Sequence, residues 1–340
     1  MLQTLQTLII GFIGAALFYR IGFPVPMLTG AAVAVTFAGL GGMKIQIPTY
    51  LRSLCFVILG IGIGSSVTFD VIRAVVTWPI SFMILTISLI FTIFFCRWIL
   101  ERYFGFDRLT AGLASAPGHL SFVLVLSEDK NADVPKVALV QSIRVLFLSL
   151  CVPFFLIILF GDMGAGLVRE ERLSFLELGL LTLGSVCLGW IFLKWRVPAA
   201  LLLSGMCVSS MTHLIEMTQG NLPDGLLYLA LVIMGSLIGT RFDGVSRKEL
   251  LLSLWAGLAL TMVGGITAFL GAICVLLLLG LDPPLLIVSF TPGGVEAMVA
   301  IASELGLSPA FVAGHHVWRL IVLGFLIPFL SRDRPNDAKG

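Results

Sequence analysis

The sequence has little charge for its size. Only 12% of its 340 residues are Asp, Glu, Lys or Arg, whereas 58% are hydrophobic. A soluble protein needs roughly a quarter of its residues charged to cover its surface, so lipid must be the solvent for most of this one. The net charge is only +2 and no basic run is present, which argues against nucleic acid as a partner.

Residues that build common catalytic and metal sites are also scarce. The four histidines, at positions 119, 213, 315 and 316, are too few for a copper or di-iron site. The sequence has no H-E-x-x-H motif, no P-loop and no G-x-S-x-G elbow. The six cysteines lie in apolar segments without a C-x-x-C pair, which is typical of small buried hydrophobes. We therefore expect neither an enzyme nor a cofactor.

What the sequence does contain is long apolar segments, six in each half. In the first half they cover roughly 4–19, 25–41, 50–67, 75–100, 108–128 and 134–160, and in the second roughly 175–193, 198–214, 224–240, 249–280, 284–303 and 308–330. Most are long enough to cross about 30 Å of hydrocarbon as helices. These segments predict a membrane repeat at 1–160, a linker at 161–174, a second repeat at 175–330 and a disordered tail at 331–340.

A pattern near the end of the first half recurs 175 residues later. Residues 117–153 align without a gap with residues 292–328, and the 7 identities in 37 positions include Pro117 with Pro292 and Arg144 with Arg319. Apolar composition alone does not produce matching Pro and Arg residues. A repeat that carries a helix break and a buried arginine is typical of membrane transporters.

The fifth apolar segment of each half is broken at its centre. Pro117-Gly118 interrupts the first copy, and Pro292-Gly293-Gly294 interrupts the second. Proline removes a backbone donor and glycine permits a turn. Each copy is therefore a discontinuous helix that crosses the membrane or a re-entrant hairpin, unless it is a simple proline kink. Irregular backbone at this depth is tolerated only where it is buried in protein or lines a wet cavity.

The distribution of Lys and Arg favours the hairpin. If the fifth segments turn back and the N-terminus is cytoplasmic, 15 of the 21 Lys and Arg residues lie on the cytoplasmic side and 4 outside. If those segments cross, the split is 10 against 9. The positive-inside rule thus predicts an all-α membrane protein of two inverted repeats, each with about five transmembrane helices and one broken element, and with both termini cytoplasmic.

Two polar residues lie deep in the sixth segment of each half. Arg144 and Arg319 come about ten residues into this segment, preceded at i−3 by Gln141 and His316. A guanidinium at mid-membrane costs at least a few kcal/mol, so it needs a partner. That partner is a carboxylate or another oxyanion, or else the backbone carbonyls that the break exposes. The two alternatives stay open, since one arginine can do both.

More polar residues follow the breaks. Ser121 and Glu296 occupy matching positions at the start of a half-helix, where the helix dipole favours an anion. Glu296 either pairs with one of the arginines or carries a coupling proton, and His119 is either a proton carrier or a hydrogen-bonded filler. Asp107 and Asp282 are expected to be helix N-caps. The predicted substrate site comprises Pro117, Gly118, His119, Ser121, Gln141, Arg144, Pro292, Gly293, Gly294, Glu296, His316 and Arg319.

The doubled element, SAPGH…QSIRV…P and TPGGVEAM…HHVWRLIV…P, resembles the AbrB family of bacterial integral membrane proteins. The resemblance covers nearly the whole chain, and PGGVEAM is its most specific part. Family members are often labelled ammonia monooxygenases or AbrB-family regulators. The resemblance implies a duplicated multi-pass protein of the plasma (inner) membrane and a loose link to gene expression, but no substrate. The first copy departs from the family pattern at His119 and Ser121, so we expect the two halves to differ in role.

Three functions follow from these observations. The first is a secondary transporter or exchanger of a small anionic metabolite that works by alternating access around the two broken elements. The second is a membrane-embedded regulator that acts indirectly on gene expression, and the third, which the residues disfavour, is a membrane oxygenase. The expected partners are the lipid bilayer and an unidentified small molecule or ion, and assembly into a homo-oligomer is left open.

Overall fold

A computed structural model describes residues 2–65, 67, 78–118, 120–161, 172–218, 220–245 and 247–330. Three predicted features lie outside the described residues: His119, positions 162–171 of the linker, and the tail at 331–340. The side chain of Ser121, together with those at 122, 125, 247, 248, 252 and 328–330, is also outside the description.

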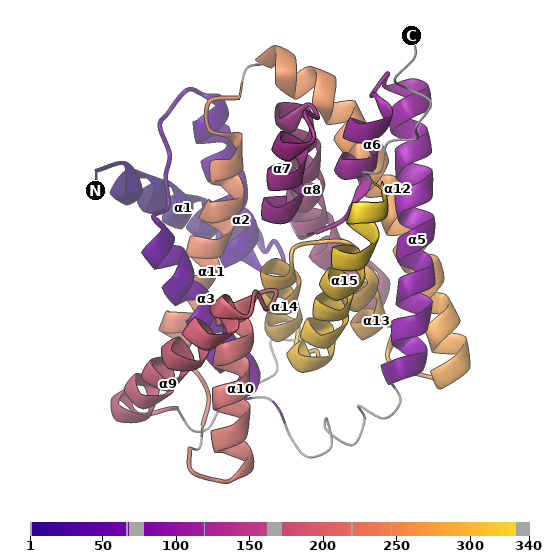
Figure 1. Ribbon diagram of the computed structural model, residues 1–340. Helices are drawn as coiled ribbons and strands as arrows, with labels where there is room; N and C mark the ends of the chain where they lie inside the picture. Colours follow the sequence, from indigo (N-terminus) through magenta and orange to yellow (C-terminus); the bar gives the residue numbers. More distant parts are fainter. Residues whose placement is uncertain are drawn as a thin grey trace.

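The described residues form helices, and their only β-type pairing is an isolated bridge between Arg172 and Asn221 (Figure 1). The first half contains α1 (Leu2–Ile21), α2 (Pro26–Leu40), α3 (Thr49–Gly64), α5 (Trp78–Tyr103), α6 (Arg108–Ser115), α7 (Leu120–Asp129) and α8 (Val134–Phe160). The second half contains α9 (Phe175–Lys194), α10 (Ala200–Leu214), α11 (Asp224–Gly239), the short 3-10 helix η2 (Thr240–Phe242), α12 (Arg247–Leu279), α13 (Pro283–Phe290), α14 (Val295–Glu304) and α15 (Pro309–Leu330).

The helices of the second half repeat those of the first at the predicted spacing. Helices α13, α14 and α15 begin 175 residues after α6, α7 and α8. The fifth segment is two separate short helices in each half, because α6 ends at Ser115 and α7 begins only at Leu120. The break at each Pro-Gly is therefore a real interruption rather than a kink in one continuous helix.

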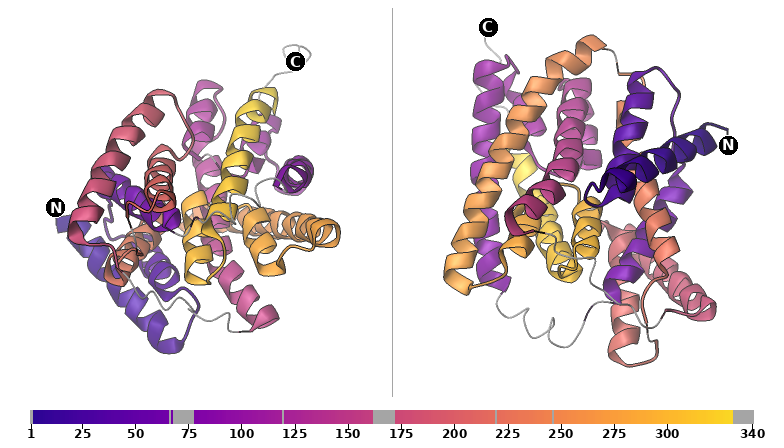
Figure 2. Two further views of the ribbon diagram at one scale, coloured as in Figure 1. Left: turned by 90° about the horizontal axis from the view of Figure 1, so that it is seen from below. Right: turned by 180° about the vertical axis from the view of Figure 1, so that it is seen from behind.

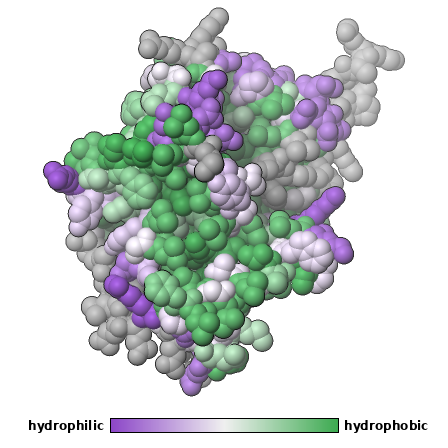
Figure 3. Space-filling model, turned by 90° about the vertical axis from the view of Figure 1, so that its left-hand side faces the viewer, coloured by the Kyte–Doolittle hydropathy of each residue, from purple (hydrophilic) through white to green (hydrophobic). Residues whose placement is uncertain are grey.

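Seven helices in the described residues are long and apolar enough to cross a membrane: α1, α5, α8, α9, α11 with η2, α12 and α15. Three shorter apolar helices, α2, α3 and α10, accompany them. Large apolar side chains face outward, with Leu277 79% and Phe94 64% exposed. Figure 3 shows one face with a broad hydrophobic centre and hydrophilic residues toward its top and edges. The chain is thus an all-helical, multi-pass membrane protein.

The helices form two bundles, and each bundle takes helices from both halves of the chain (Figures 1 and 2). The first bundle consists of α1–α3 and α9–α11, and the second of α5–α8 and α12–α15. Both broken elements, α6–α7 and α13–α14, belong to the second bundle.

Glycines hold the first bundle together across the two halves. A Cβ at Gly60 of α3 would strike the Leu202 carbonyl oxygen of α10, and a Cβ at Gly235 of α11 would strike the Leu28 carbonyl oxygen of α2. Gly60 and Gly235 are 175 residues apart. Each half therefore contributes one helix whose backbone lies against a helix of the other half, as small residues permit in membranes.

The two short helices of the first broken element fold back on each other. The Asp133 backbone N–H, just beyond α7, donates to Thr110 Oγ1 near the start of α6 at 3.1 Å. The entry of α6 and the exit of α7 therefore lie side by side. In Figure 1, α6 and α7 lie toward one end of the molecule and α13 and α14 toward the other.

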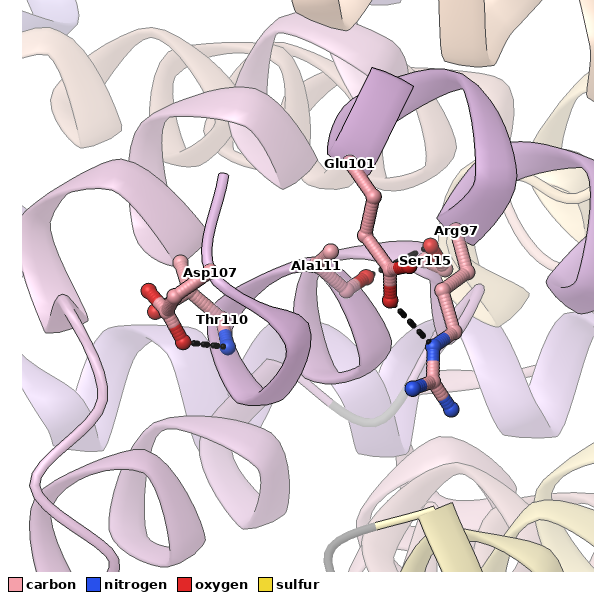
Figure 4. A network of polar contacts seen from close by, with 6 residues as sticks. All are labelled: Arg97, Glu101, Asp107, Thr110, Ala111 and Ser115. Atoms are coloured by element: carbon pink, nitrogen blue, oxygen red, sulfur yellow. Dashed lines mark hydrogen bonds and ion pairs between the residues drawn. The ribbon is translucent and has the colours of Figure 1, made fainter. Parts of the chain in front are cut away.

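Of the two predicted N-caps, Asp107 and Asp282, only Asp107 makes a capping hydrogen bond. Asp107 Oδ1 accepts a hydrogen bond from the Thr110 backbone N–H at 2.9 Å and caps α6 (Figure 4). Asp282 stands at the N-cap position of α13, but its side chain makes no capping bond. The residues that follow it are Pro283 and Pro284, which have no N–H, so Leu285, the counterpart of Thr110, is the first residue of α13 that could donate to a cap.

Candidate functional site

Both deep arginines bind the carbonyls that the breaks expose. Arg319 donates through Nη1 to the Thr291 carbonyl at 2.9 Å and through Nη2 to the Gly293 carbonyl at 2.6 Å. Arg144 donates through Nη2 to the Ala116 carbonyl at 3.4 Å, and Ala116 corresponds to Thr291 in the repeat. Of the two predicted kinds of partner, the arginines of both halves thus bind the exposed backbone carbonyls. Helices α8 and α15 therefore each hydrogen-bond to the interrupted backbone of their own half.

The residues at i−3 make a second, equivalent brace. Gln141 Nε2 donates to the Leu113 carbonyl at 3.1 Å, and His316 Nε2 lies 3.2 Å from the Val288 carbonyl, 28 residues back in each case. Gln and His are therefore interchangeable donors here. His315 points elsewhere, because its Nε2 is 2.6 Å from Ser81 Oγ, on α5.

Bracing leaves several buried donors unused. The donors Arg319 Nε and Arg144 Nε and Nη1 have no hydrogen-bond partner in the described part of the chain, and neither does His316 Nδ1, which is an acceptor when Nε2 donates. Arg144 and Arg319 are 1% and 2% exposed. A guanidinium offers five N–H donors, and leaving buried donors unpaired costs about 1–3 kcal/mol each. Such donors are natural binding points for water or a solute.

A cavity of about 420 Å³ lies where the two bundles meet. Six predicted site residues line it: Gly118, Gln141, Gly293, Gly294, Glu296 and Arg319. Four others do not, and all four are buried beside it: Pro117, Arg144, Pro292 and His316. Pro292 packs instead against Gly264 of α12, where an added Cβ would lie 2.7 Å from its Cγ. The two arginines therefore share a bracing geometry but differ in their access to the cavity.

The two breaks come together at this cavity. Gly118 has φ +98°, a conformation that glycine adopts without strain. A Cβ at Gly118 would lie 3.2 Å from Leu320 Cδ2 and 3.7 Å from Arg319 Nε and Nη2. The turn of the first half thus packs against the arginine of the second half, so one site is built from both repeats.

Glu296 is half-buried in the first turn of α14 and faces the same cavity. Gly294 is the N-cap of α14, and no side chain caps the helix, so its first N–H groups lie at the cavity wall. Glu296 interacts electrostatically with Arg241 and Arg319. However, no described cation lies within 4.0 Å of its carboxylate, so the first of the two alternatives for Glu296, a direct ion pair with Arg319 or Arg144, is not formed in the described residues.

The first bundle contributes three arginines to the cavity that sequence reasoning missed as site residues. Arg52 lies in the first turn of α3, Arg196 in the α9–α10 connection and Arg241 in η2, and all three side chains are exposed. The Arg52 guanidinium lies 5.3 Å from the centre of the Phe56 ring. In the sequence these residues resemble ordinary cations at membrane boundaries, because they flank apolar runs. Nothing in the repeat marks them, since position 227, which matches Arg52, is a leucine.

The chemistry of this site is that of anion recognition. It combines arginine donors, an uncapped helix N-terminus and a single carboxylate, an arrangement suited to an oxyanion. Across the described residues, no group of three or more His, Cys, Asp and Glu side chains is placed to hold a metal ion.

The fold and the cavity define a multi-pass helical membrane protein with a polar site between two bundles. The chain belongs to the AbrB family, because the family model described as "Transition state regulatory protein AbrB" matches residues 27–333. It is 26% identical over 329 residues to "Putative regulator AbrB" of Escherichia coli (strain K12), covering 93% of this chain and 91% of that protein. It is 27% identical over 297 residues to "Uncharacterized protein YhjN" of Bacillus subtilis (strain 168), covering 80% and 75% respectively.

Proposed function

We propose that the chain is a secondary transporter or exchanger that moves a small anion by alternating access. The observation that carries this proposal is the cavity between the bundles, which both broken elements reach and which Arg319 lines. An interrupted backbone at mid-membrane needs a wet cavity or protein around it. The proposal assigns no enzymatic step to the chain, and nucleic acid has no part in it.

The proposed architecture is two inverted repeats of five spans and one re-entrant hairpin. The described residues include ten apolar helices, seven long and three shorter, which fit this number of spans. The fold-back of α6 on α7 supports re-entry, and the opposite placement of α13–α14 in Figure 1 supports inversion. With the charge bias of the loops, this arrangement puts both termini in the cytoplasm of a bacterium, with the chain in its plasma (inner) membrane.

In the proposed mechanism, the two bundles are the bodies that move relative to each other. The first bundle is interlocked by the glycine contacts of α3 with α10 and of α11 with α2, so it acts as one rigid unit. The second bundle carries both hairpin tips and Arg319. A solute held at Arg319 and the start of α14 would gain access to alternate sides as the second bundle shifts against the first.

The test begins with thermal unfolding of the detergent-purified protein in the presence of acetate, succinate and phosphate. An anion that raises the midpoint is then tested for counterflow in proteoliposomes. We expect Arg319→Gln to lose both the shift and the flux. Arg144→Gln is the matched comparison, since Arg144 braces its break but does not line the cavity; it should lower stability yet keep the ligand shift. Absence of counterflow with well-folded protein would rule the transporter out.

The printed names of the family and of the Escherichia coli relative favour a second candidate, a membrane-embedded regulator. Such a protein would influence gene expression indirectly, through a soluble partner or through the level of the solute that it binds. Co-purification of a soluble protein with the wild-type chain, combined with ligand binding but no counterflow, would support this alternative over transport.

A further inference from the structure

The charges that line the cavity are unequal in number. Among the described residues of the lining, four arginines, Arg52, Arg196, Arg241 and Arg319, face one carboxylate, that of Glu296. The formal charge of this set is therefore 4 − 1 = +3. A solute with one negative charge leaves most of this excess uncompensated. A solute with two negative charges compensates more of this excess than a monoanion, so the lining itself favours a more highly charged anion.

The arginines are divided between the two bundles. Arg319 belongs to α15 of the second bundle and stands near the uncapped start of α14. Arg52, Arg196 and Arg241 belong to the first bundle, and Arg241 is an electrostatic neighbour of Arg52. Glu296 lines the same cavity and interacts electrostatically with Arg241 of one group and Arg319 of the other. The cavity thus has two anion-binding poles, one on each body.

We infer that the solute is a small dianion, of the dicarboxylate class, that bridges the two poles. This inference rests on the proposed function. One anionic group binds the guanidinium of Arg319, which lines the cavity, and the first N–H groups of α14, while the other binds the arginines of the first bundle. Guanidinium forks match the planar geometry of carboxylates. A volume of about 420 Å³ is within the usual range for small-molecule sites and holds a short dicarboxylate with water.

A substitution of Glu296 is expected to affect anion binding in the opposite direction from a substitution of an arginine. The Glu296 carboxylate repels any anion that enters between the poles. Glu296→Gln removes that repulsion while keeping the shape of the side chain. We therefore expect Glu296→Gln to tighten anion binding, whereas neutralising an arginine in the cavity weakens it. A general loss of structure would weaken binding in both kinds of variant.

The experiment compares ligands of equal chain length at fixed ionic strength. Binding of succinate and butyrate to the purified wild-type protein is measured by calorimetry and thermal shift at pH 7.5, where succinate is a dianion and butyrate a monoanion. We expect succinate to bind at least about tenfold more tightly, the equivalent of one charge-assisted hydrogen bond. Equal binding of the two ligands, or binding of neither to folded protein, would overturn the inference.

Two variants locate the second pole. Arg241→Gln should weaken succinate binding about tenfold and narrow its advantage over butyrate. Arg102→Gln removes the same charge from an exposed position at the end of α5 and should leave succinate binding unchanged. Equal effects of the two variants would mean that only the overall charge matters, which contradicts a two-pole site.

Two further measurements distinguish a failure of the dicarboxylate inference from a failure of the transporter proposal. Glycerol 3-phosphate replaces a dicarboxylate with a phosphate dianion; if it alone binds, the dicarboxylate class is wrong. Counterflow in proteoliposomes tests transport independently of binding. A preference for succinate without counterflow would refute the transporter and leave the dianion site standing. Equal counterflow of butyrate and succinate would support the transporter and refute the dianion site.

Discussion

Gly118 shows how closely the two halves depend on each other at the level of one residue. Its φ of +98° is strained for any residue with a Cβ, and that Cβ would meet Leu320 at 3.2 Å. We predict that Gly118→Ala costs about 1–3 kcal/mol from backbone strain, with a further cost because the turn is pushed away from Arg319. The measurement is the thermal midpoint of the purified protein.

The control for this prediction is Gly22→Ala. Gly22 also has a positive φ, +74°, but a Cβ there would meet nothing within 4 Å. It therefore reports backbone strain alone. The excess destabilisation of Gly118→Ala over Gly22→Ala measures the contact between the first break and the second half. If the two variants lower the midpoint equally, that contact has no energetic weight.

At the scale of a single element, the start of α6 depends on its cap. Partial burial acts to raise the pKa of the Asp107 carboxyl, but hydrogen bonds from Thr110 and the neighbouring backbone N–H groups outweigh it and lower the pKa. Because the folded pKa lies below the unfolded value of about 4, the cap stabilises the protein at neutral pH. This stabilisation is lost as the pH falls through the folded pKa. Asp107→Ala should cost about 1 kcal/mol at pH 7 and less near pH 3.

Asp282→Ala is the matched variant in the other half. Asp282 occupies the same position of the repeat but makes no capping bond. Its replacement should leave the thermal midpoint at pH 7 nearly unchanged. If Asp282→Ala lowers the thermal midpoint as much as Asp107→Ala does, the capping bond of Asp107 is not the cause of the destabilisation.

The elements themselves were largely predictable from the sequence. Hydrophobic length located the helices, and matched Pro-Gly pairs located both breaks, since few residues other than proline and glycine interrupt a helix so reliably. The i−3 spacing placed Gln141 and His316 on the same helix face as the arginines, but their contacts with the Leu113 and Val288 carbonyls were not predicted. The arginines of the first bundle were not predictable as site residues. Whether a cation at a helix end faces lipid headgroups or a cavity depends on how the helices pack, and local sequence does not encode this.

At the scale of the whole molecule, the duplication has produced interlocked halves rather than two adjacent ones. The first bundle joins α3 to α10 and α11 to α2, so each half completes the packing of the other. The second bundle does the same around the cavity, where the first break packs on Arg319 of the second half. A site that needs both halves can be asymmetric, with Arg319 lining the cavity and Arg144 outside its lining, while the helices around the two breaks keep their 175-residue repeat.

This interlocking can be tested on a single helix. A Cβ at Gly235 of α11 would strike the Leu28 carbonyl and lie 2.9 Å from the Ala31 Cβ, so Gly235→Ala must push α11 away from α2. We expect a cost of about 1–3 kcal/mol, as for other overpacked sites.

Gly225 lies on the same helix, and a Cβ added there would meet nothing within 4 Å, so Gly225→Ala should be neutral or stabilise by up to about 1 kcal/mol. Gly60→Ala should reproduce the Gly235 result, because it separates the matching pair, α3 and α10. Thermal midpoints of the three variants test this interlocking. If Gly235→Ala lowers the midpoint no more than Gly225→Ala does, the halves are not interlocked through these glycines, and the first bundle is not the rigid body of the proposed transport cycle.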